Sequence, residues 1–271
     1  MPWWGVTLLG LSPTDKSVNL KIPKGTLMTW QTNPTVIWVR GLARNLGLTR
    51  ILGSFIERGS YEEAFDDALF TAIRPGDIIW DVGANVGHYT QKFAEAVGED
   101  GQVFAFEPFP STLARLKARL AETAGCPRGK IVAHAVALGA EVGTLNMQGG
   151  TDDLGATSRI LKGNTAEEGS SEIFEIEIQT ADAIVADGRA AMPNVVKIDT
   201  EGFELDVLQG MGAVLAEHVL HAVFVEVHFG LLADRGMADA PSTIEALLGD
   251  AGFETTWIDP SHIAGTRPQT A

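Results

Sequence analysis

The sequence is poor in cysteine, in positive charge and in long apolar runs. Its 271 residues include one cysteine, Cys126, which excludes an intrachain disulfide and a cysteine-built zinc or iron–sulfur site. Lys and Arg number 20 against 35 Asp and Glu, and the net charge of −15 disfavours nucleic acid and anionic membranes as partners. No apolar run approaches the roughly 18 residues of a membrane-spanning helix, so no membrane span is predicted.

A secretory signal and internal repeats are also lacking. The opening residues, MPWWGVTLLGLSP, have neither the basic start nor the small-residue cleavage site of a signal peptide. Together with the single cysteine, this favours a cytoplasmic protein. What the chain does contain is 45% apolar residues, enough for a globular core, and we expect one catalytic core.

The middle of the chain alternates strand-like and helix-like segments. Short apolar runs predict buried strands at 77–82, 101–107, 131–138, 195–199 and 221–228. Apolar residues three and four apart predict crossover helices, among them one that carries Leu205, Leu208, Met211 and Leu215. Weaker patterns at 253–258 and 263 add a hairpin. The sequence therefore predicts an α/β protein with a mostly parallel sheet and helices on both faces.

Two stretches depart from this alternation. Residues 149–171 are rich in Gly and acidic residues, which favours a substrate-gating insertion, and 174–178 alternate like an exposed strand. The first residues hold four of the six tryptophans, assigned to core packing or to a homodimer contact. We expect a cap or substrate segment at 1–70 and a cofactor-binding catalytic domain at 71–271.

A glycine turn follows the first predicted strand. The run from Asp81 through Gly83 and Asn85 to Gly87 stands where a helix begins, so backbone amides face a ligand there. Glu107 ends the next strand, where α/β nucleotide binders place an acid for the ribose hydroxyls. The spacing is G-x-x-x-G, with Asn85 where a dinucleotide fingerprint has its second glycine. That difference weakens the case for a pyrophosphate ligand.

A second polar group lies at the ends of the fourth and fifth predicted strands. Asp199 and Glu201 follow the fourth strand, and Glu204 is explained by the favourable effect of an acid in the first turn of a helix. Glu226 has apolar neighbours on both sides, and His228 follows it. Since parallel strands end at one edge, these side chains are expected near the glycine turn.

Four blocks in this order resemble the FkbM-type S-adenosylmethionine-dependent methyltransferases: DVGANVGHYT, FAFEPFPSTLARL, VVKIDTEGFELDVLQGM and FVEVH. The resemblance implies a class I methyltransferase (Rossmann-like) fold with a seven-stranded sheet. It implies methyl transfer from S-adenosylmethionine to a hydroxyl of a sugar or natural-product scaffold. By motif, Asp81, Gly83, Asn85 and Gly87 would form the loop on the methionine side, and Glu107 would hold the ribose.

Transfer to a hydroxyl requires one base and good alignment. We predict His228 as the base, because imidazole titrates near neutrality, with Asp199 and Glu226 as alternatives and Glu201 as a weaker one. Catalysis without metal is preferred. A divalent cation on Asp199, Glu201, Glu226 and His228 is the variant.

Two other functions fit the same sheet. An NAD-dependent oxidoreductase shares the strand–helix–strand unit and the ribose acid, and a non-catalytic scaffold would keep the fold without chemistry. The expected partner is a small-molecule or glycan hydroxyl acceptor, without nucleic acid.

Overall fold

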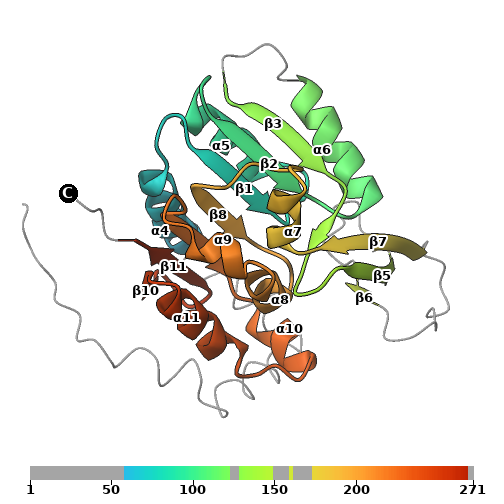
Figure 1. Cartoon of the computed structure of the whole chain (residues 1–271), viewed down its shortest axis with the longest axis vertical. Coiled ribbons are helices and arrows are strands. Elements are labelled where there is room, and N and C mark those ends of the chain that lie inside the picture. The colour runs from blue at the N-terminus through green and yellow to red at the C-terminus, as the bar shows by residue number, and fades with distance from the viewer. Residues whose placement is uncertain (1–57, 123–127, 149–158, 161–172, 268–271) are drawn as a thin grey trace, which may run out of the picture. The chain divides into compact units, whose positions relative to one another are not determined.

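The computed structural model describes residues 58–122, 128–148, 159–160 and 173–267 (Figure 1). All of them belong to the second of two compact units, Leu48–Ala271. The tryptophan-rich start of the chain, Cys126 and most of the expected 149–171 insertion lie outside the described residues. Within the described part of the chain, no helix combines the length and the apolar character needed to cross a membrane.

A seven-stranded sheet forms the centre of this unit, in the order β10-β11-β9-β8-β1-β2-β3 (Figure 1). Five neighbouring strands are parallel, and β11 alone runs antiparallel to both of its neighbours. This confirms the predicted mostly parallel sheet and its terminal hairpin. The strands are β1 (Ile78–Val82), β2 (Gln102–Phe106), β3 (Lys130–His134), β8 (Val195–Ile198), β9 (Ala222–Glu226), β10 (Glu254–Trp257) and β11 (His262–Thr266).

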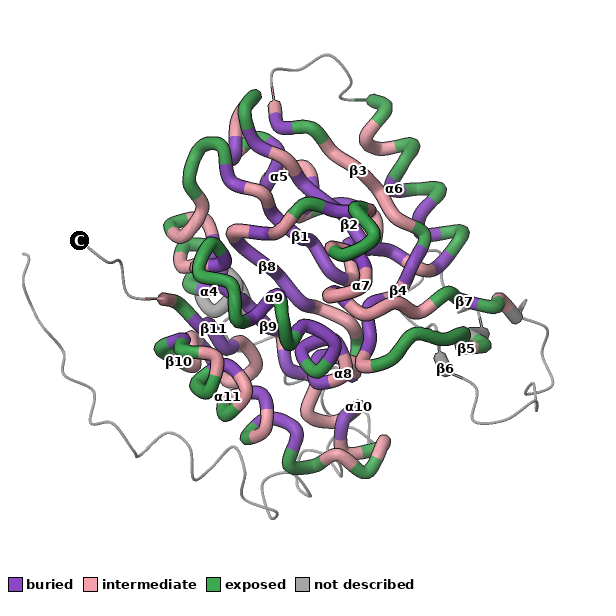
Figure 2. Tube along the Cα trace, viewed as in Figure 1, coloured by how far each residue is buried: buried purple, intermediate pink, exposed green. Residues whose placement is uncertain are grey.

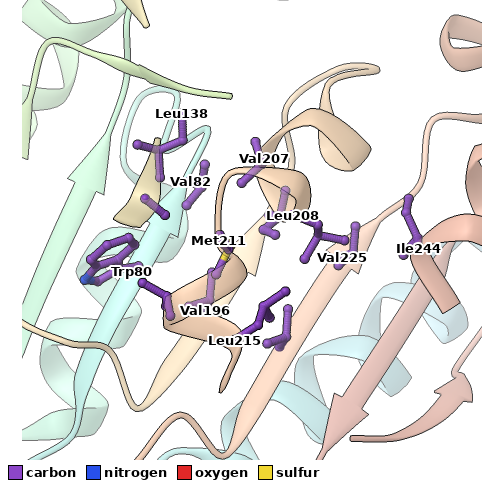
Figure 3. Packing of buried hydrophobic residues seen from close by; sticks show 14 of the residues in the cluster. Trp80, Val82, Leu138, Val196, Val207, Leu208, Met211, Leu215, Val225 and Ile244 are labelled. Carbon is purple, nitrogen blue, oxygen red and sulfur yellow. The ribbon is translucent and has the colours of Figure 1, made fainter. Parts of the chain in front are cut away.

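Helices cover both faces because successive strand residues point to opposite sides. One face packs Ile79, Val195 and Phe224 beneath α4 (Arg58–Ala72) and α5 (His88–Val97), with α6 (Pro110–Glu122) beside them. The alternate residues, such as Trp80 and Val196, face the second helical layer (Figure 3). That layer comprises α7 (Ala181–Ala186), α8 (Glu204–Gln209), α9 (Gly212–Ala216) and α11 (Ala240–Asp250), and α10 (Phe229–Asp234) follows β9.

The central strands β1, β2, β8 and β9 are buried along most of their length (Figure 2). Polar residues near the carboxyl ends of β1, β8 and β9 interrupt this apolar pattern. Asp81, Lys197 and Glu226 share the α4 and α5 face with Ile79, Val195 and Phe224, because they lie two residues further along the same strands. The sheet thus places these three polar side chains on one face, near the carboxyl ends of its parallel strands.

A smaller sheet lies beside the main one and corrects one expectation while confirming another. The predicted strand 131–138 is divided: β3 ends at His134, and after a bend β4 (Ala137–Leu138) pairs with β7 (Ile173–Gln179) in the second sheet. The order there is β4-β7-β5-β6, with β5 (Gly143–Gln148) and β6 (Arg159–Ile160). The expected exposed strand 174–178 is confirmed within β7, where Glu175 and Glu177 are exposed on either side of buried Ile176.

The predicted helix carrying Leu205 to Leu215 is also two helices. It breaks at Gly210, between α8 and α9. A Cβ at Gly210 would overlap the carbonyl oxygen of Gly139, so the break allows the backbone that leaves β4 to pass close by. All four apolar residues are nevertheless buried on the sheet, as their spacing predicted.

The boundary predicted at residue 70 falls inside α4. Phe65 and Leu69 of this helix are 2% and 0% exposed and belong to the same core cluster as Phe93 and Phe224. The Phe65 ring meets the Phe224 ring edge-on, with 5.9 Å between centroids. The division into segments 1–70 and 71–271 stays a prediction.

Removing the Phe65 ring should destabilise the fold strongly. Phe65→Ala leaves a cavity between α4 and the sheet, and the free energy of unfolding should fall by about 3–5 kcal/mol in urea titration. The control Val219→Ala truncates a side chain that is 52% exposed and should change stability by less than about 0.5 kcal/mol. Equal losses would mean that α4 does not pack as described.

Candidate active site

The glycine turn after β1 is a tight loop with three left-handed residues. Gly83, Asn85 and Gly87 have φ values of 79°, 50° and 83°. The amides of Gly83 and Ala84 both donate to the carbonyl of Phe106, which joins the loop to the end of β2. A Cβ at Gly83 would overlap the carbonyl oxygen of Asp199. The glycine is therefore required by packing against the end of β8, a reason that the sequence did not reveal.

Glu107 holds this loop from the next strand. Its Oε2 accepts the Asn85 amide at 2.9 Å and its Oε1 accepts the Phe109 amide at 2.9 Å. The residue is 7% exposed, and burial raises the pKa of its carboxyl to about 7. Each oxygen keeps a further lone pair, so the carboxylate still presents two adjacent acceptors that suit a pair of hydroxyls. The predicted ribose acid therefore lies against the predicted glycine turn.

Asp81 is fully buried at the end of β1. Its Oδ2 accepts a hydrogen bond of 2.6 Å from the Thr90 hydroxyl, whereas Oδ1 has no hydrogen-bond partner among the described residues. Burial raises the pKa of this carboxyl, and the Lys197 ammonium, 3.9 Å from Oδ1, opposes the rise. A buried acceptor without a donor is costly, which indicates that a ligand donor belongs there.

Lys197 lies between Asp81, beside the glycine turn, and Asp199, after β8. It was not among the site residues predicted from the sequence. It is 2% exposed, and its Nζ donates to Asp199 Oδ2 at 3.2 Å and lies 4.6 Å from the centre of the Tyr89 ring. Burial opposes its charge, but Asp199 and then Asp81 raise its pKa above the ordinary value. A lysine inside the apolar run VVKID was the available signal, because an unpaired lysine is seldom buried.

The structure brings the three predicted catalytic residues together. His228 Nε2 lies 3.9 Å from Asp199 Oδ1, 3.8 Å from Glu226 Oε1 and 3.4 Å from Glu201 Oε2. One ligand atom from each of Asp199, Glu226 and His228 falls within 4.8 Å of the others, a grouping that suits a divalent cation. The predicted trio is therefore one cluster.

The other nitrogen of His228 determines its charge. Nδ1 lies 2.8 Å from Glu204 Oε1, and Glu204 is 0% exposed. Burial opposes the imidazolium, but the hydrogen bond and charge of Glu204, then Glu201 and Asp199, raise the pKa of His228 to about 9. His228 is therefore protonated at neutral pH. Glu204, assigned from the sequence to the helix start, is the partner of this imidazole.

A second buried acid and imidazole pair flanks Glu226 from the other side. His262 Nδ1 lies 2.6 Å from Asp259 Oδ2, and its Nε2 lies 3.6 Å from Glu226 Oε2. Burial opposes its charge, but Glu226 and Asp259 raise the pKa of His262. Sequence reasoning missed both residues, because they lie near the end of the chain outside the four recognised blocks.

This strand order, with the glycine turn after β1 and the predicted ribose acid Glu107 after β2, defines the class I methyltransferase fold. Residues 81–255 match the family described as Methyltransferase FkbM domain. The chain belongs to this family, which confirms the resemblance carried by the four sequence blocks, and its cofactor is S-adenosylmethionine.

Two curated relatives agree with this placement. The chain is 31% identical over 179 residues to hexuronic acid methyltransferase AglP of Haloferax volcanii, covering 66% of this chain and 64% of that protein. It is 31% identical over 233 residues to 31-O-demethyl-FK506 methyltransferase FkbM of Streptomyces tacrolimicus, covering 76% of this chain and 85% of that protein. The match to AglP thus spans a little less than two thirds of the relative.

A solved structure is also similar. The crystal structure of methyltransferase FkbM from Methylobacillus flagellatus gives a TM-score of 0.48 at 14% sequence identity. The similarity covers 84% of this chain and 60% of that chain.

A Cβ at Gly83 should disrupt the cofactor loop more than backbone strain alone. Gly83→Ala forces the loop away from Asp199, so the affinity for S-adenosylmethionine should fall about tenfold or more in calorimetric titration. The control Gly236→Ala has the same backbone strain, with φ 80°, but no atom near the added Cβ. It should cost about 1–2 kcal/mol of stability and leave cofactor affinity unchanged. Equal affinities in the two variants would contradict the role of the loop.

The His228 imidazolium should depend on Glu204. NMR titration of the wild type should place its pKa near 9, and Glu204→Gln should move that pKa toward the ordinary 6.5. Because the pKa is raised on folding, this charge stabilises the fold below about pH 6.5, and the contribution disappears as pH rises through about 9. Glu217→Gln, at an exposed site, is the control. An unchanged titration in Glu204→Gln would overturn this account.

Proposed function

We propose that this chain is an S-adenosylmethionine-dependent O-methyltransferase that acts on a hydroxyl of a sugar or a related natural product. Family membership supports methyl transfer, and the names of the two relatives support the acceptor class, since one acts on a hexuronic acid and the other on 31-O-demethyl-FK506. The observation that carries the proposal is the cluster of Asp199, Glu226 and His228 at the strand edge that also holds the glycine loop.

The cofactor residues have separate tasks. When bound, S-adenosylmethionine supplies an electrophilic methyl group. Glu107 offers two carboxylate oxygens to the ribose hydroxyls. Asp81 Oδ1, which accepts no hydrogen bond from the described residues, can accept one from the cofactor. Gly83, Asn85 and Gly87 shape the loop between them. These residues fit the cofactor, because a buried acceptor and a double acceptor flank the same loop.

The proton of the acceptor hydroxyl goes to a carboxylate in this proposal. His228 is charged at neutral pH and has no free lone pair for a proton. Asp199 Oδ2 already accepts a hydrogen bond from Lys197, and Glu226 is the more exposed of the two carboxylates, so we assign the proton to Glu226. His228 then lies beside Glu226 as a positive charge, in place of the free base expected from the sequence.

Cofactor and acceptor assays separate this function from its alternatives. Purified full-length protein should bind S-adenosylmethionine in calorimetric titration and transfer a labelled methyl group to members of a panel of glycosides, uronosides and macrocyclic alcohols. Binding of NAD alone would favour the oxidoreductase, and cofactor binding without transfer to any acceptor would favour the scaffold. Activity that survives exhaustive EDTA treatment would exclude the cation on Asp199, Glu226 and His228.

The pH profile identifies the base. Glu226→Gln should lower turnover about 10²-fold or more, while the affinity for S-adenosylmethionine is retained, because only the proton acceptor is lost. If Glu226 is the base and the His228 charge assists it, wild-type turnover should fall as pH rises through about 9. Turnover that rises through this pH and is abolished by His228→Ala would instead make neutral His228 the base.

A further inference from the structure

A cavity of about 370 Å³ adjoins the proposed catalytic cluster of Asp199, Glu226 and His228, on the face covered by α4 and α5. Its volume is at the lower end of the range for ligand pockets, which suits one ring-sized group. Glu226 belongs to both the cavity and the cluster, so a ligand here would reach the proposed proton acceptor. The lining includes Phe65 and Asp66 of α4, Tyr89 and Lys92 of α5, and Glu226 and His262 at the sheet edge.

We infer that this cavity is the acceptor site and that it takes a hydroxyl-rich ring, whose reacting hydroxyl binds between Glu226 and His262. The inference rests on the proposed function for the reaction. Neither the recognised sequence blocks nor the family match, which ends at residue 255, extends to His262. The cavity, the pairing of β9 with β11 and the two imidazoles support it independently.

Glu226 has both carboxylate oxygens available for a ligand. Oε1 is 3.8 Å from His228 and Oε2 is 3.6 Å from His262, and both distances are longer than a hydrogen bond. Among the described residues, no ion pair of this carboxylate is shorter than 3.6 Å. Its neighbours differ, because Glu204 accepts from Gly202 and Asp259 accepts from Ser261. A hydroxyl is the donor that would satisfy Glu226.

His262 supplies the complementary donor. Each of its ring nitrogens faces a carboxylate oxygen: Nδ1 faces Asp259, whose side chain is 1% exposed, and Nε2 faces Glu226, so an N–H on Nε2 points toward the cavity carboxylate. The Phe65 ring lies against the imidazole with 4.1 Å between centroids, which limits its rotation. A hydroxyl both donates and accepts, so the oxygen of an alcohol fits between one carboxylate and one imidazole nitrogen.

The remaining walls favour further hydroxyls and a flat ring face. Asp66 accepts from the Tyr89 hydroxyl at 2.7 Å and from Lys92 at 3.1 Å. This gives a second donor and acceptor group in the lining of the cavity. The charges are paired on both sides, and the Phe65 and Tyr89 rings lie edge to face with 6.4 Å between centroids. Paired polar groups beside aromatic rings suit a sugar ring better than an apolar one.

The test uses full-length protein loaded with S-adenosylhomocysteine and labelled at histidine Cε1 for NMR. Three probes are titrated: methyl β-D-glucopyranoside, methyl β-D-glucopyranosiduronate and cyclohexanol. At least one sugar should shift the His262 resonance saturably, and cyclohexanol should not. Glu226→Gln and His262→Gln should each weaken sugar binding about tenfold or more, because each removes a charged hydrogen-bond partner. For Glu226→Gln, sugar binding is measured from the shift of the His262 resonance. For His262→Gln, sugar binding is measured by saturation transfer from the protein to the sugar.

The matched control is His218→Gln, which alters an exposed histidine before the opposite end of β9 and should leave sugar binding unchanged. Thermal unfolding and affinity for S-adenosylhomocysteine identify any variant that misfolds, and Tyr89→Phe then serves as a second cavity variant. The inference is overturned if no sugar shifts His262, if cyclohexanol shifts it equally, or if sugar binding persists in the Glu226 and His262 variants. Sugar binding in the cavity without methyl transfer to any member of the acceptor panel would refute the proposed function and leave the sugar-binding site supported.

Discussion

The buried ammonium of Lys197 is the interaction on which the whole polar edge depends. It lies among Asp81, Asp199 and Tyr89 with almost no exposure to solvent. Two carboxylates at the ends of adjacent strands would repel each other and resist burial without a positive charge between them. Because β1 and β8 are paired in register, with Asp81 opposite Lys197, the lysine reaches both acids from the centre of the sheet. The predicted cofactor loop and the proposed catalytic cluster are thereby joined through one charge.

The same reasoning extends along the edge toward β11. From Asp81 the charges alternate through Lys197 and Asp199 to His228, then through Glu226 to His262. Glu204 pairs with Nδ1 of His228, and Asp259 pairs with Nδ1 of His262. Both of these acids are buried. Each positive group faces acids on more than one side, so the negative charge of the edge is offset locally although the chain as a whole carries −15. This local balance lets a carboxylate such as Glu226 stay ionised while its oxygens remain open to a ligand.

Strand direction explains which residues meet at this edge. The parallel strands β1, β2, β8 and β9 end there, and β11 begins there because it runs antiparallel to β9. Its first residue, His262, is registered opposite Glu226, the last residue of β9. The hairpin that closes the sheet therefore contributes a side chain to the proposed acceptor site. The second sheet, in contrast, diverges after β3 and places none of the residues discussed at the catalytic cluster.

Local patterns were enough to predict the sheet, the terminal hairpin, the glycine turn and Glu107, because apolar periodicity and turn chemistry are properties of neighbouring residues. They also placed Asp199, Glu226 and His228 at one edge, since parallel strands end together. The charge on His228, the pairing of Glu204 with it and the approach of His262 to Glu226 were decided by tertiary structure. Those features depend on distances between residues far apart in the chain and on burial, which changes the cost of a charge, and a linear pattern contains neither.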